Sequence, residues 1–418
     1  MKSFKKVFIA CSVLSVSSFS AVVSAQEPAI ACPGYQAPKT VLLGERVGKK
    51  LTNAFDAYNE DRIEEAIQIL RDADPKEDFD KASVDRFLGQ LLLSMDDKEK
   101  DAYDLFVGAT KNKVLNDKDH AELLELNGHL ALALEQYADA IDWYNKWMDF
   151  TCKESEKVWV RIAQAYNELK QYSKVVSPAD KAIALQEEPN KNPYILKLNA
   201  FIETKEFLKA VKVAETLVQL FPTDRLWWSQ LGMMYMMVED YPKALETFSA
   251  AHRAGYLTKK NEFKALYQLY AQLDAPMQAA RIFQKYLDSG VFDQTADEYA
   301  ALANVYHQAK EFKLAAQFYG KAAQTDPDPD YYKKQGNLLL SAEDYRGAVN
   351  ALKKAIDAGV DDPERVHFAL MQANYYAGNY REAHSSAVEA RKDNSLRRNV
   401  NAWIALIKNK AKNRGISI

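Results

Sequence analysis

A small residue recurs in this chain at a nearly constant interval, and that interval limits the folds open to it. The positions are Ala66, Ala102, Ala140, Val175, Ala210, Ala244, Ala279, Ala315, Ala348 and Ala383. Successive members lie 33 to 38 residues apart. A period near 34 is typical of stacked helix–turn–helix units, each of which completes its core only against its neighbours. The sequence therefore predicts an all-α chain of about ten helical hairpins.

Larger residues keep fixed distances from the small ones. The clearest unit contains Trp228, Leu231, Gly232, Tyr235, Ala244, Phe248 and Ala251, which become positions 4, 7, 8, 11, 20, 24 and 27 when Trp228 is counted as position 4. We expect position 8 of the first helix to face position 20 of the second, because two small residues let paired helices approach closely. Glycine and proline, with 15 and 13 residues, are too scarce for long flexible linkers.

This spacing resembles the tetratricopeptide repeat (TPR) family from about residue 48 to 395. A second unit fits all eight characteristic positions with Tyr299, Leu302, Ala303, Tyr306, Ala315, Tyr319, Ala322 and Pro327. The resemblance implies an α-solenoid that winds into a right-handed superhelix. The expected organisation is an extended arm over residues 26–45, a solenoid over 46–395, and a basic capping helix with its tail over 396–418.

The resemblance also implies that the first helix of each unit lines a concave, partner-binding groove. Position 9 carries a primary amide in six of eight units, and one amide per unit would suit the backbone of an extended peptide. The alternative is that position 9 is simply a solvated polar site. The predicted groove comprises Gln164, Asn167, Asn199, Met233, Met236, Met237, Gln268, Asn304, His307, Asn337, Gln372, Tyr375 and Tyr376. Its methionines either form an adaptable apolar surface for a partner or fill gaps in the core.

Some TPR domains hold a terminal carboxylate with a lysine at position 5 and an asparagine at position 9. Lys333 and Asn337 match this first half of the clamp, but the next unit carries Ala369 where a further basic residue would complete it. The sequence therefore predicts no clamp for a chaperone tail.

Residues 1–25 have the layout of a secretory signal peptide. Three lysines precede an apolar run, and Val23-Ser24-Ala25 offers the small residues that signal peptidase requires. A retained membrane anchor is the alternative. Removal of the signal leaves 52 basic and 58 acidic residues, a balance that argues against nucleic acid as a partner. The basic start looks bacterial, so we expect a periplasmic protein, with peripheral attachment to the membrane as a further option.

Two cysteines, Cys32 and Cys152, remain after the signal is removed. An even pair in an exported protein predicts a disulfide, and this one would fasten the N-terminal arm to the third repeat. The alternative is a pair of free thiols.

The final helix is strongly basic. Asp393 is the sole acid between residues 391 and 418, against eight lysines and arginines. Val400, Trp403, Ile404 and Ile407 form one apolar stripe, which would cover the last repeat. The alternative is contact with an anionic membrane surface or an acidic partner.

Catalytic motifs are not found in the sequence. It lacks a glycine-rich phosphate loop, a His-Glu-x-x-His pair and a Gly-x-Ser-x-Gly elbow, and its six histidines are dispersed. We therefore expect a binding protein rather than an enzyme, with no cofactor and no metal site.

The N-terminal arm carries a narrower resemblance. Cys32-Pro33-Gly34-Tyr35, Val47-Gly48-Lys49-Lys50 and Ala54-Phe55 resemble periplasmic TPR proteins that accompany TonB, ExbB and ExbD. This resemblance implies an interaction scaffold in energy-coupled iron uptake across the outer membrane, with TonB-system components among its protein partners. The alternatives are an envelope-assembly factor for outer-membrane proteins or cell-wall machinery, and a regulatory subunit of a periplasmic enzyme.

Overall fold

The computed structural model describes residues 29–39 and 41–418. The chain divides into two compact units, Met1–Leu196 and Lys197–Ile418, and the division falls within one helix. Each unit is described by itself. The predicted signal peptide, residues 1–25, lies outside the described residues, and the predicted domain boundaries stay predictions.

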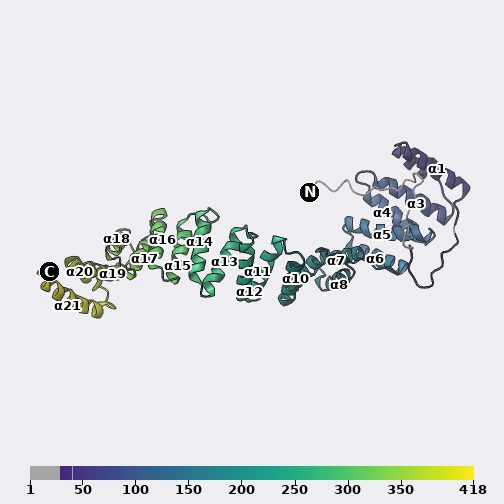
Figure 1. Ribbon diagram of the computed structural model, residues 1–418. Coiled ribbons are helices and arrows are strands. Elements are labelled where there is room, and N and C mark those ends of the chain that lie inside the picture. The colour runs from purple at the N-terminus through teal and green to yellow at the C-terminus, as the bar shows by residue number, and fades with distance from the viewer. Residues whose placement is uncertain (1–28, 40) are drawn as a thin grey trace, which may run out of the picture. The chain divides into compact units, whose positions relative to one another are not determined.

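The first unit consists of eight complete α-helices and a 3₁₀ turn within its described residues (Figure 1). They are α1 (Glu45–Asn59), α2 (Ile63–Arg71), α3 (Asp78–Leu93), α4 (Glu99–Thr110), α5 (Asp117–Ala133), α6 (Tyr137–Thr151), α7 (Glu156–Glu168), η1 (Tyr172–Lys174) and α8 (Val176–Ala184). Helix α9 (Asn192–Glu203) contains the division between the units.

The second unit continues with helices of similar length. They are α10 (Phe207–Leu220), α11 (Arg225–Met237), α12 (Tyr241–Arg253), α13 (Lys260–Gln272), α14 (Pro276–Asp288), α15 (Ala296–Gln308), α16 (Phe312–Thr325), α17 (Pro329–Ser341), α18 (Tyr345–Asp357), α19 (Pro363–Tyr376), α20 (Tyr380–Ala390) and α21 (Arg397–Asn413).

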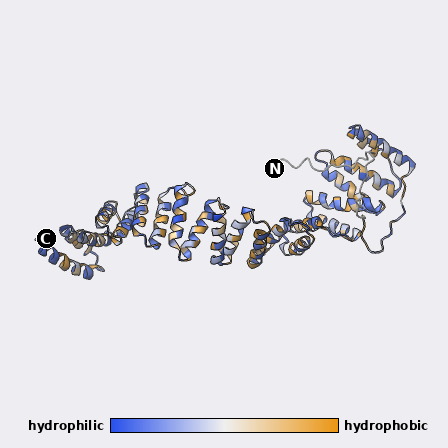
Figure 2. Ribbon diagram, viewed as in Figure 1, coloured by the Kyte–Doolittle hydropathy of each residue, from blue (hydrophilic) through white to orange (hydrophobic). Residues whose placement is uncertain are grey.

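Helices adjacent in sequence pack against each other in both units, as in α3 with α4 and α15 with α16. No strand occurs among residues 29–39 and 41–418, so the predicted all-α class is confirmed. Figure 2 shows hydrophobic and hydrophilic residues intermixed along these helices. In the described part of the chain, no helix combines the length and the hydropathy needed to cross a bilayer. The number of repeats and the handedness of the superhelix stay predictions.

The periodic small residues lie where the paired helices meet. Every one of the ten is 0% exposed, from Ala66 in α2 to Ala383 in α20. The structure adds a contact of position 8 that the spacing did not predict. A Cβ added to Gly232 would meet the ring of Phe248 at 2.6 Å, and one added to Gly128 would meet the ring of Tyr144 at 2.6 Å. The nearest neighbour of position 8 is therefore the bulky residue at position 24, which covers the gap that glycine leaves.

Two helical glycines of the first unit give a matched test of this packing. A Cβ at Gly108 would meet nothing closer than a carboxylate oxygen of Asp85 at 3.8 Å, whereas one at Gly128 would overlap Tyr144. Because alanine is the better helix former, Gly108→Ala is expected to stabilise the unit by up to about 1 kcal/mol. Gly128→Ala is expected to destabilise it by about 1–3 kcal/mol through overpacking. Urea denaturation followed by circular dichroism would measure both, and shifts of the same sign would contradict this packing.

The turns inside the hairpins depend on a single left-handed residue. The sequence shows these turns only as short polar breaks, but Asp61, Glu239 and Glu343 adopt φ of 63°, 60° and 61°. The amide of Asp240 then donates to the carbonyl of Tyr235 at 2.9 Å, which closes the end of α11. Non-glycine residues are uncommon in this conformation, so propensity alone does not reveal these caps.

The extended N-terminal arm is tied to several helices of the first unit. Cys32 forms a disulfide with Cys152, which follows directly after α6. Beside it, the amide of Ala31 donates to the carbonyl of Thr151 at 2.8 Å. Further along, the Tyr35 hydroxyl donates to Asp117 at the start of α5, and the amide of Gly44 donates to Asp80 in α3 at 3.0 Å. The arm therefore connects the end of α6 with the starts of α5, α3 and α1.

The last helix packs its apolar stripe against the preceding one. Val400, Ile407 and Ala411 of α21 are 0% exposed and lie in one cluster with Ala383 and Ala387 of α20. Trp403 and Ile404 are partly buried against the same cluster. Helix α21 thus covers the apolar side of α20, as the stripe in the sequence predicts.

Candidate functional site

The predicted groove residues all lie on odd-numbered helices. Gln164 and Asn167 lie on α7 of the first unit, and Asn199 lies on α9. Met233, Met236 and Met237 lie on α11, Gln268 on α13, Asn304 and His307 on α15, Asn337 on α17, and Gln372, Tyr375 and Tyr376 on α19. Most of the predicted groove residues therefore belong to the second unit.

Four odd-numbered helices of the second unit are connected in series. The connections are the hydrogen bond from Gln308 Nε2 to the carbonyl of Ala271 (2.9 Å), that from Tyr331 Oη to Asp297 Oδ1 (3.2 Å), and the ion pair of Lys333 Nζ with Asp362 Oδ1 (2.8 Å). They join α13 to α15, α15 to α17, and α17 to the start of α19. The position-9 amides therefore occupy equivalent places on successive, directly joined helices.

The amides differ in how freely they face solvent. Gln268, Asn304 and Asn337 are exposed, and Gln372 is half-buried. The carbonyl oxygen of Asn304 accepts a hydrogen bond of 2.6 Å from the hydroxyl of Tyr319, whose pKa is raised by burial. That bond orients the Asn304 side chain and leaves its N–H₂ group as the donor for a ligand.

The methionines of α11 contribute unequally. Met237 is 49% exposed, Met233 and Met236 are half-buried, and Met234 is only 6% exposed. Met237 is thus the methionine of this helix that is most available to a partner, while Met234 belongs to the core. His307 is exposed on α15, with its ring centroid 5.9 Å from that of Phe312.

Tyr375 and Tyr376 belong to a larger aromatic cluster that sequence reasoning missed. Tyr376, 53% exposed, stacks on Tyr345 of α18 with ring centroids 5.1 Å apart. Trp403 of α21 meets Tyr375 and Tyr376 edge-on, at 5.4 and 6.1 Å. The cluster unites residues that are as many as 58 positions apart in the chain, and no local pattern in the sequence joins them.

Sequence reasoning also missed a recurring bond that positions the odd-numbered helices. The tyrosines at position 11 of α11, α13 and α15 each hydrogen-bond a polar side chain of the preceding even-numbered helix. The pairs are Tyr235 with Glu215, Tyr270 with Ser249, and Tyr306 with Gln284. Burial raises the pKa of both Tyr235 and Tyr306, so these hydroxyls stay protonated. A polar residue 20 to 22 positions before each tyrosine is the signal that could have revealed them.

Lys333 is already engaged by the chain itself. Its ammonium group pairs with Asp362 at 2.8 Å and Asp330 at 3.4 Å, and the hydrogen bond to Asp362 is the main reason that its pKa is raised. It is therefore committed to helix–helix contact rather than to a ligand carboxylate.

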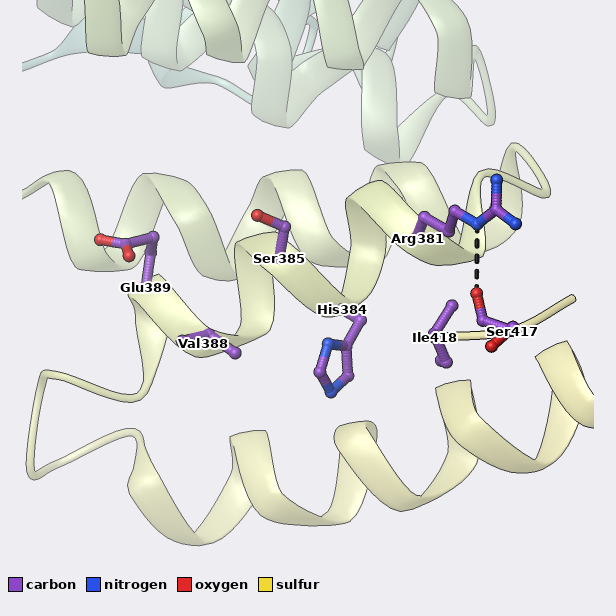
Figure 3. A pocket seen from close by; sticks show the side chains of 7 residues that line it. All are labelled: Arg381, His384, Ser385, Val388, Glu389, Ser417 and Ile418. Atoms are coloured by element: carbon purple, nitrogen blue, oxygen red, sulfur yellow. Dashed lines mark hydrogen bonds between the residues drawn. The ribbon is translucent and has the colours of Figure 1, made fainter.

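Two shallow pockets are present, and neither is lined by a predicted groove residue. One, of about 400 Å³, lies in the first unit between Asn145 and residues 159–178. The other, of about 380 Å³, lies on α20 beside the chain's last residues (Figure 3). Figure 3 shows that the side chains of His384 and Ser385 do not point toward each other, and that Arg381 donates to the carbonyl of Ser417.

Among the described residues, no group of three or more His, Cys, Asp or Glu side chains could hold a metal ion.

Comparison with known families matches two stretches of the second unit. Residues 298–329 and residues 333–377 each match a family model described as tetratricopeptide repeat. The first stretch covers most of α15 and all of α16, and the second covers most of α17 and all of α18 and α19. The matched stretches contain three of the predicted groove residues, Asn304, Asn337 and Gln372.

More distant likenesses extend over other parts of the chain. Anaphase-promoting complex subunit 3 of Schizosaccharomyces pombe is 24% identical over 185 residues, which is 43% of this chain and 27% of that protein. A TPR protein from Parabacteroides merdae covers 60% of this chain and 98% of its own, at 15% identity and a TM-score of 0.35. YrrB, described as a TPR protein with an unusual peptide-binding site, covers 48% and 99%, at 21% identity and a TM-score of 0.34.

Proposed function

We propose that this chain, which carries tetratricopeptide repeats at residues 298–329 and 333–377, is an exported scaffold that holds an extended segment of a partner protein. The carrying observation is the row of position-9 amides, Gln268, Asn304, Asn337 and Gln372, on successive joined helices. Each amide offers both donor and acceptor groups, so a row of them can pair with the backbone of an extended peptide.

Rigid placement supports this role. The tyrosine bonds at position 11 hold α11, α13 and α15 against the helices before them, and the Tyr319 bond orients Asn304. A groove whose polar groups are already oriented loses less conformational freedom when a peptide binds. The exposed Met237 and Tyr376 would add apolar contacts for side chains of the same segment.

We further propose that the protein works in the periplasm as an accessory of a TonB-type iron-uptake system. The signal-like residues 1–25 and the arm motif Cys32-Pro33-Gly34-Tyr35 support this assignment. Two residues of that motif hold the arm in place, Cys32 through its disulfide and Tyr35 through Asp117. The partner segment would then belong to a TonB-system component exposed in the periplasm.

A pair of substitutions in the groove tests the amide row. Gln268→Ala combined with Asn337→Ala removes two exposed amides, whereas Asn304 is avoided because Tyr319 also depends on it. Calorimetric titration with the soluble periplasmic domain of the source organism's TonB is expected to show about tenfold weaker binding, since each lost hydrogen bond contributes about 0.5–1.5 kcal/mol. Circular dichroism should remain that of the wild type.

The matched control removes the same two residue types from even-numbered helices. Gln278→Ala combined with Asn350→Ala alters exposed amides of α14 and α18 and should leave the affinity unchanged. Equal affinity for both double variants and the wild type would refute the amide row. A wild-type chain that binds no TonB-system component, and captures cell-wall enzymes alone from periplasm, would overturn the transport role and favour an envelope-assembly role.

A further inference from the structure

Helix α21 presents positive charge that the chain does not neutralise. Arg397, Arg398, Lys408, Lys410, Lys412 and the adjacent Arg414 are all exposed. No acid follows Asp393 in the sequence, and within the described residues none of the six forms an ion pair, although the neighbouring Lys392 pairs with Glu389. A cluster of like charges on a stable helix repels itself, so an external anion would relieve it.

Four of these cations share one side of the helix. They are Arg397, Arg398, Lys408 and Lys412, and we call them the cationic flank. At 100° per residue their Cα atoms fall within an arc of about 100°. Asn401 and Ala405 lie between them on the same arc, so the flank is interrupted only by short neutral side chains.

The apolar side of α21 is already occupied. Val400, Ile407 and Ala411 are fully buried in the cluster that α21 shares with α20. The helix is thus held with its cationic flank facing solvent, and its apolar stripe is not available for insertion into a bilayer. The arc of the flank contains no large apolar side chain, so its contact with a surface would be electrostatic.

We propose that the cationic flank binds the phosphate groups of an anionic phospholipid bilayer. Neither shallow pocket is lined by a residue of the flank. Long, flexible cations on an open surface suit the diffuse charge of a headgroup layer, and each contributes to binding through proximity alone. An acidic protein segment, by contrast, needs a shaped surface to be held in one register.

The experiment is cosedimentation of the full-length chain with vesicles of phosphatidylglycerol and phosphatidylcholine in equal parts. The protein is purified from cells that export it. The chain is expected to bind these vesicles more strongly than pure phosphatidylcholine. Raising the salt to 1 M should release it, because the Debye length shrinks from about 10 Å at 0.1 M to about 3 Å. Any retained apolar leader would bind both vesicle types, so the difference between them isolates the charge effect.

Replacing all four flank residues by glutamine is expected to lower the partition coefficient by about three orders of magnitude, since each cation contributes about 1 kcal/mol. The matched control, Arg253→Gln, Arg281→Gln, Lys313→Gln and Lys353→Gln, removes equal charge from exposed sites on α12, α14, α16 and α18 and should change it little. Equal losses in both variants, equal binding to neutral vesicles, or binding to polyglutamate without binding to vesicles would overturn the proposal. The groove takes no part in this assay, so a negative vesicle result would leave the scaffold proposal standing. A negative result in the groove titration would likewise leave the proposal of phospholipid binding standing.

Discussion

Replacing Phe248 by alanine is expected to destabilise the α11–α12 hairpin by about 3–5 kcal/mol. The ring is 0% exposed and covers Gly232, whose missing Cβ would lie 2.6 Å from it. Because Gly232 and Ala244 are both small, neither can fill the space that the ring leaves. Because a cavity remains, the free energy of unfolding should fall by an amount in the upper part of the range for core phenylalanines.

A second substitution turns this expectation into a test of packing. In the wild-type chain, Gly232→Ala should destabilise the hairpin by about 1–3 kcal/mol, since its methyl group overlaps the Phe248 ring. In the Phe248→Ala background the same methyl group enters an empty space and also favours the helix, so Gly232→Ala should stabilise by up to about 1 kcal/mol. The sign of the effect is therefore expected to invert between the two backgrounds.

Native-state hydrogen exchange, resolved by mass spectrometry on α11 and α12, would measure these changes locally. Leu208→Ala is the control, because that leucine is 72% exposed and its removal should alter protection little. Additive effects of Gly232→Ala and Phe248→Ala would show that position 24 does not cover position 8.

Removing the Cys32–Cys152 disulfide is expected to destabilise the first unit by about 3–5 kcal/mol. The bridge spans 120 residues, and closure of so long a loop restricts the unfolded chain strongly. The double variant Cys32→Ser with Cys152→Ser should therefore unfold the first unit at lower urea concentration. The remaining contacts of the arm, such as the bond from Ala31 to Thr151, do not replace a covalent link.

Reductant provides the control for this prediction. It should bring the wild-type chain to the stability of the serine variant and leave that variant unchanged. Hydrogen exchange should show the loss in α1 to α6, which the bridge encloses, and not in α15 and α16 of the second unit. An identical urea midpoint with and without the bridge would contradict an entropic role for it.

Much of the groove could be placed from the sequence, and some of its chemistry could not. Position counting put Gln268, Asn304 and Asn337 on the first helix of each hairpin, and all three are exposed there. It did not reveal that the Tyr319 hydroxyl donates a hydrogen bond to the side-chain carbonyl of Asn304, or that Lys333 forms an ion pair with Asp362. Those partners depend on which way long side chains turn, and a repeat pattern carries no record of rotamers.

The spacing of small residues by itself determined that this chain folds into helical hairpins, because close helix approach requires a gap at one fixed place in every repeat. All ten of those residues are fully buried as a result. The tertiary structure alone decided that the gap of Gly232 is covered by Phe248, and that Tyr345, Tyr376 and Trp403 form one cluster. Such contacts join separate helices, so they depend on how whole helices dock and not on any local pattern of residues.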